Sequence, residues 1–83
     1  MSLHLDYIGI DIAKAHLDVF DPVAGHRRLA NTPAAIAGWI ATLAGRSVFV
    51  VLEATGHYDS ALRHSLHAAG LGHARINPMQ ARR

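Results

Sequence analysis

The chain has 83 residues and a formal net charge of +2, with 51% hydrophobic and 17% charged residues. This length allows one domain with a small core, because such a chain buries only about 60 to 65% of its unfolded surface. The absence of cysteine excludes a disulfide framework and a thiolate metal site, and it is consistent with the cytoplasm. We expect no membrane span and no secretory signal, since the chain lacks an apolar run of about 18 residues and a basic start followed by an apolar segment.

Three short strands are predicted in the first third of the chain. Ile8, Ile10 and Ile12 alternate with small or polar residues, and this period of two is typical of a strand. Pro22 and Gly25 mark a turn between the second and third strands. Because the three strands are joined tightly, we expect an antiparallel meander. They cover about residues 6–13, 16–21 and 26–30.

A helix is predicted next, with Thr32 as its N-cap, Pro33 at its first position and Gly45 at its end. Its apolar residues recur at spacings of three and four, which places them on one face. They are Ile36, Trp39, Ile40 and Leu43. We assign Trp39 to the core rather than to a ligand platform, because it follows this period.

Residues 47–54 are apolar on both faces, as expected for a central parallel strand, and this strand ends near Glu53. A second helix is predicted from about residue 57 to 69. Its inner face is expected to carry Tyr58, Ala61, Leu62, Ser65, Leu66 and Ala69. A short last strand covers about residues 73–77, and Pro78 stops it.

The predicted order is therefore βββαβαβ, an α/β fold. Right-handed crossovers give a mixed five-stranded sheet of order 3-2-1-4-5, with both helices on one face. The other face has no helix, although sheets with parallel strands are normally covered on both sides. We therefore expect that the chain lacks the carboxy-terminal part of the fold, or that the bare face associates with another copy.

Two carboxylates stand at the ends of predicted neighbouring strands. Asp11 and Glu53 should converge, because parallel strands bind ligands at their carboxyl ends beside a switch in strand order. Adjacent carboxylates repel each other, and a hard divalent cation such as Mg²⁺ removes that penalty. Such ions assist phosphodiester cleavage. The alternative is structural, since a strand-end carboxylate can also cap a turn or bond to the following loop.

Four segments of the chain resemble the amino-terminal part of insertion-sequence transposases with a RuvC-like DEDD domain. The specific motifs are GIDIAK and LEATGHY, and the segments occur in the expected order. They are YIGIDIAKAHLDVFD, NTPAAIAGWIATL, VVLEATGHYDSALRHSLHAAG and ARINPMQARR.

The resemblance implies an RNase H-like fold, with residues 1–83 as an incomplete RuvC-like domain, and a Mg²⁺-dependent DNA recombinase in which Mn²⁺ can substitute. It matches Asp11 and Glu53 to the first two of four catalytic, metal-binding acidic residues. The other two, and a carboxy-terminal domain, would lie past residue 83. We therefore expect the chain alone to bind metal weakly and to be inactive or nearly so. The resemblance also implies DNA and, in full-length members, a guide RNA as partners.

Several further residues are candidates for contact with nucleic acid, or else lie in solvent or serve the turn after Glu53. They are Lys14, Thr55, Gly56, Arg75, Arg82 and Arg83. Asp18 is expected to face solvent on a half-exposed strand. His64 and His67 stand three apart on the second helix, but we expect no zinc site, because zinc needs three or four converging ligands.

Two other function classes remain open. One is a non-catalytic α/β module that forms a homodimer through its bare sheet face. The other is a fragment of an actin-like ATPase or sugar kinase, which shares the strand order and a strand bearing a GID-type Asp. Residues 12–16, Ile-Ala-Lys-Ala-His, disfavour the second class, because a turn without glycine is a poor phosphate cradle.

Overall fold

The computed structural model describes residues 4–54 and 56–77, which form seven elements in the predicted order. Each strand boundary lies within one residue of its prediction. The elements are β1 (Asp6–Ile12), β2 (His16–Asp21), β3 (Gly25–Ala30), α1 (Pro33–Ala41), β4 (Val48–Glu53), α2 (Ser60–Ala68) and β5 (Gly72–Ile76).

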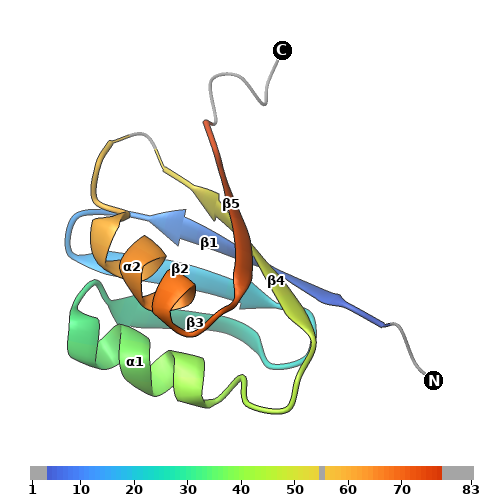
Figure 1. Ribbon diagram of the computed structural model, residues 1–83. Helices are drawn as coiled ribbons and strands as arrows, with labels where there is room; N and C mark the ends of the chain where they lie inside the picture. The colour runs from blue at the N-terminus through green and yellow to red at the C-terminus, as the bar shows by residue number, and fades with distance from the viewer. Residues whose placement is uncertain (1–3, 55, 78–83) are drawn as a thin grey trace.

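The five strands form one sheet of order β3-β2-β1-β4-β5, as predicted. The first three strands are an antiparallel meander, while β4 runs parallel to both β1 and β5. Both helices pack on the same side of this sheet (Figure 1). The described chain is therefore a two-layer α/β structure whose second sheet face carries no helix.

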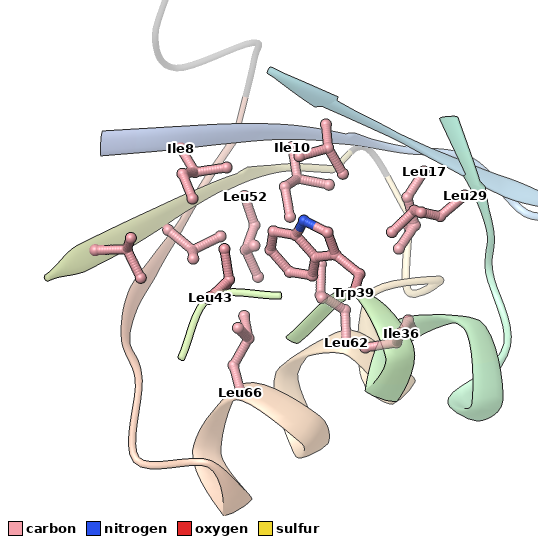
Figure 2. Close-up of a cluster of buried hydrophobic side chains, with 13 residues drawn as sticks. Ile8, Ile10, Leu17, Leu29, Ile36, Trp39, Leu43, Leu52, Leu62 and Leu66 are labelled. Atoms are coloured by element: carbon pink, nitrogen blue, oxygen red, sulfur yellow. The ribbon is translucent and has the colours of Figure 1, made fainter. Parts of the chain in front are cut away.

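The hydrophobic core lies between the sheet and the two helices (Figure 2). Trp39 is 3% exposed and stands between both layers, which confirms its assignment to the core. Alternate residues of the inner strands face it, because side chains in a strand point to opposite faces in turn. Burial of each large aliphatic side chain contributes about 1.5 to 3 kcal/mol. The most buried are Ile8, Ile10, Leu17, Val19, Ile36, Val50, Leu52, Leu62 and Leu66.

Helix α1 begins as predicted and ends earlier. The Thr32 hydroxyl accepts a hydrogen bond from the backbone N–H of Ala35 at 3.2 Å, and Pro33 follows it. The helix stops at Ala41, so Gly45 is not its terminal glycine. Gly45 instead lies in the connection to β4 with φ of 80°, a left-handed conformation that glycine adopts without strain.

Helix α2 begins at Ser60, three residues later than predicted, because residues 57–59 form a turn. The prediction that Tyr58 packs on the inner face is therefore wrong, and its side chain is 43% exposed. Leu62 and Leu66 are fully buried as expected. Each helix has nine residues, and none in the described ranges is long and apolar enough to cross a membrane.

The turn between β2 and β3 is stabilised by its own first side chain. Oδ1 of Asp21 accepts hydrogen bonds from the backbone N–H groups of Val23 at 2.8 Å and Ala24 at 3.2 Å. Gly25 then adopts a φ of 86°. An aspartate side chain that accepts a hydrogen bond from the backbone N–H two residues later favours a turn at that position.

Candidate functional site

Asp11 and Glu53 are register partners on the adjacent parallel strands β1 and β4. Neighbouring strands lie about 4.8 Å apart, and paired residues point to the same face. Each residue is at or next to the carboxyl end of its strand, since β1 ends at Ile12 and β4 at Glu53 itself. The fold thus brings together two carboxylates that are distant in the sequence.

Both carboxylates lie on the sheet face that has no helix. The residues before them, Ile10 and Leu52, are buried in the core, so the alternation turns Asp11 and Glu53 the other way. Asp11 is exposed and Glu53 is half-buried. They line a hollow of about 190 Å³ whose other lining residues are Gly9, Ile10, Phe20, Val51 and Ile76.

No hydrogen bond or ion pair joins the side chain of Asp11 or Glu53 to another residue within 4–54 and 56–77. Two ionised carboxylates this close repel one another, and a bound cation would relieve that repulsion. Residues 4–54 and 56–77 contain no group of three histidine, aspartate or glutamate residues placed to hold a metal ion. The hollow therefore offers two oxygen-bearing side chains, and water would complete the shell of a cation held there.

Asp18 is a third carboxylate in the same row, because it pairs with Asp11 across β1 and β2. Asp18 lies on the sheet face without helices, as expected, but its side chain is only 17% exposed because Arg28 and His26 lie against it. Arg28 Nε donates to its Oδ1 at 2.9 Å and Arg28 Nη2 donates to its Oδ2 at 3.1 Å. Hydrogen bonds from Arg28 first, and then from His26, lower the pKa of Asp18 to about 2. Its charge is thus neutralised within the protein, unlike that of Asp11.

Arg75, predicted to contact nucleic acid, is engaged inside the protein. Its Nε lies 3.0 Å from Oδ2 of Asp59, and its Nη2 donates to the carbonyls of Ala54 at 3.3 Å and Gly56 at 2.8 Å. These contacts tie β5 to the connection between β4 and α2. Arg75 is therefore a structural tie in this conformation, and contact with a phosphate stays a prediction.

The other predicted contacts are more exposed or lie outside the described residues. Lys14 is exposed in the connection from β1 to β2. Gly56 is half-buried, and a Cβ placed on it would meet the Tyr58 ring at an ordinary distance of 3.5 Å. The space around it therefore does not demand glycine. The predictions for Thr55, Arg82 and Arg83, and the stop at Pro78, fall outside the described residues.

The residues that shape the hollow were not singled out from the sequence. Gly9 and its two register partners, Phe20 on β2 and Val51 on β4, all line it. A Cβ on Gly9 would meet nothing within 4 Å, so this glycine leaves open space beside Asp11. The period of two in β1 could have identified Gly9, because it shares a face with Asp11.

No protein-family model matches the chain, and no curated protein matches it either. The fold and the two paired carboxylates are therefore the observations from which a function can be inferred.

Proposed function

We propose that this chain is the amino-terminal part of a RuvC-like DEDD transposase domain with an RNase H-like fold. In this proposal Asp11 and Glu53 are the first two carboxylates of a Mg²⁺-dependent site that acts on phosphodiester bonds of DNA. The observation that carries it is the register pairing of Asp11 with Glu53 on parallel strands. The strand order β3-β2-β1-β4-β5, with both helices on one side, supports it.

The two side chains fit a hard cation, since Mg²⁺ takes carboxylate oxygens and retains several waters. When bound, the ion would supply positive charge that favours attack on a phosphodiester phosphorus. Asp11 and Glu53 would hold it at the mouth of the hollow, where Asp11 is exposed to incoming DNA. Asp18 does not join them in this role, because Arg28 and His26 already occupy its oxygens.

Two carboxylates are too few to fix two ions at a set separation. We therefore expect this chain by itself to bind Mg²⁺ or Mn²⁺ weakly and to leave DNA uncleaved. Incubation of the purified chain with supercoiled plasmid and Mg²⁺ measures this directly. Plasmid nicking that disappears in the Asp11→Asn variant would show that the pair is sufficient and would contradict this part of the proposal.

A titration of Mn²⁺ into ¹⁵N-labelled protein tests the metal site. We expect paramagnetic broadening of amide signals to be centred on Asp11 and Glu53, and to be lost in Asp11→Asn and in Glu53→Gln. Asp18→Asn is the matched control, because it removes a carboxylate from the same row whose charge is already neutralised. Broadening that is absent, or that follows Asp18 instead, would count against the proposed site.

A second candidate function is self-association without catalysis, through the sheet face that has no helix. Large apolar side chains on this face are exposed, with Tyr7 at 63%, Phe20 at 52% and Ile76 at 37%. Aromatic residues of this kind are enriched at the centre of homodimer interfaces. The occupant in this candidate is a second copy of the same chain.

A further inference from the structure

A second hollow lies on the helical side of the sheet, between α2 and β5. It has a volume of about 460 Å³, and we name it the α2–β5 groove. Four of the seven histidines of the chain line it. The complete lining is His57, Asp59, Ser60, Arg63, His64, His67 and His73.

The single acidic side chain of the groove is neutralised by arginines. Asp59 is 5% exposed, and its Oδ2 lies 3.0 Å from Arg75 Nε and 3.7 Å from Arg63 Nη1. Helix α2 and strand β5 themselves contain no aspartate or glutamate. The groove is therefore neutral to positive, and its remaining charge depends on the histidines.

The groove histidines differ from the other three in their partners. His4, His16 and His26 each lie within 3.9 Å of an aspartate oxygen. In the described chain, none of the four groove histidines has a carboxylate within salt-bridge distance. His73 places its Nδ1 2.9 Å from the carbonyl of Leu71, which leaves its Nε2 available to a ligand.

We propose that the α2–β5 groove binds the phosphodiester backbone of a nucleic acid when its histidines are protonated. An imidazolium and an arginine donate charge-assisted hydrogen bonds to phosphate oxygens. The basic side chains of α2 run from Arg63 to His67, about 6 Å along the helix axis, with His57 before the helix and His73 on β5, so they do not meet at one point. This spread favours successive phosphates of a strand over one small anion. A metal is disfavoured, because no three potential ligands of the described residues converge.

The inference adds a binding surface to the proposed function and rests on its identification of nucleic acid as the partner. It does not depend on Asp11 or Glu53, which lie on the opposite face of the sheet. No base contact is involved, so we expect binding without sequence preference and with strong salt dependence.

The groove should respond to pH, since imidazole is the side chain that ordinarily changes charge between pH 5 and 8. The groups that face it are Arg63, His64 and His67 from α2, His73 and Arg75 from β5, and His57 and Asp59 from the preceding turn. Helix α1, which packs beside α2, contributes no titratable side chain. Arginine and aspartate ordinarily keep their charge over this range, so the histidines would supply the change.

Fluorescence anisotropy with a labelled single-stranded DNA of mixed sequence, in EDTA and low salt, tests the proposal at pH 5.5 and pH 8.0. We expect binding to be at least about tenfold tighter at pH 5.5. The double variant His64→Gln/His67→Gln should lose most of this difference. The matched control His16→Gln/His26→Gln removes two histidines that pair with Asp18 and should retain it. Circular dichroism checks that each variant is folded.

Equal loss in both double variants, or binding that does not change with pH, would overturn the proposal. Binding of inorganic pyrophosphate at the groove histidines, without binding of DNA, would also overturn it. If DNA binding does not depend on the groove histidines but Mn²⁺ still broadens the signals of Asp11 and Glu53, only this inference is refuted. If the histidines govern DNA binding but Mn²⁺ causes no such broadening, only the proposed metal site is refuted.

Discussion

At the scale of single residues, the most buried ion pairs among the described residues lie away from Asp11 and Glu53. Arg46, in the connection from α1 to β4, bridges two aspartates of the sheet. Its Nη1 lies 2.8 Å from Oδ2 of Asp21, and its Nη2 lies 3.0 Å from both Oδ1 of Asp21 and Oδ2 of Asp6. Asp21 is 7% exposed, and its hydrogen bonds with Arg46 hold its pKa far below the usual range.

Asp21→Asn should destabilise the fold by about 2 kcal/mol, because it removes charge-assisted hydrogen bonds and leaves Arg46 poorly compensated. The folded pKa of Asp21 lies below its ordinary value of 3.8. Its contribution to stability is therefore fully present above that value and is lost as pH falls through the folded pKa. Urea unfolding at pH 7 and at pH 3 measures both effects, and the variant should lose less stability on acidification than the unmodified chain. An equal acid response in both proteins would contradict the prediction.

At the scale of elements, two glycines differ in the backbone conformation that they adopt. Gly38 lies inside α1, where its φ is not in the left-handed region and a Cβ would meet nothing within 4 Å. Gly25 begins β3 with φ of 86°, and a Cβ there would also meet open space. Backbone conformation alone therefore separates the two positions.

Gly38→Ala should stabilise the protein by about 0.5 to 1 kcal/mol, because alanine loses less conformational entropy in a helix. Gly25→Ala should destabilise it by about 1 kcal/mol, because its Cβ opposes a left-handed conformation. The midpoints of thermal unfolding should move in opposite directions. A matching shift of both midpoints would show that packing, and not backbone conformation, governs one of these positions.

At the scale of the whole molecule, the two sheet faces differ completely. One face packs against α1 and α2 (Figure 1). The other exposes Tyr7 and Phe20, and Phe20 also lines the hollow that holds Asp11 and Glu53. Such a patch on a small chain is typical of a surface that another molecule covers. This asymmetry is the structural basis of the self-association candidate.

The Tyr7→Ser/Phe20→Ser variant should bind less ANS and should sediment as a monomer at concentrations where the unmodified chain associates. Both side chains are largely exposed in the single chain, so its stability should change little. Sedimentation velocity over a range of concentrations measures the association. A strictly monomeric unmodified chain would remove the self-association candidate while leaving the metal site untouched.

The order of the elements, the strand order and the place of Trp39 in the core could all be predicted from the amino-acid sequence. The sequence also placed Asp11 and Glu53 at strand ends that should be neighbours. These features follow from local chemistry, since hydrophobic period, caps and turn residues act within a few positions, and the handedness of crossovers then limits the topology. The helix ends were predicted less accurately. Helix α1 stops at Ala41 before Gly45, and α2 starts only at Ser60, where Asp59 pairs with Arg75 and makes no side-chain cap bond.

Which charged side chains are paired within the protein could be learned only from the folded chain. Asp18 and Asp11 look alike in the sequence, yet Arg28 on β3 neutralises Asp18, while Asp11 has no ion pair within the described residues. Arg75 looks like a free basic residue, yet it pairs with Asp59 in the turn before α2. The α2–β5 groove likewise cannot be predicted from the spacing of apolar residues in the sequence. In each case the partners are distant along the chain, and electrostatic pairing depends on separations of a few ångströms that only folding sets.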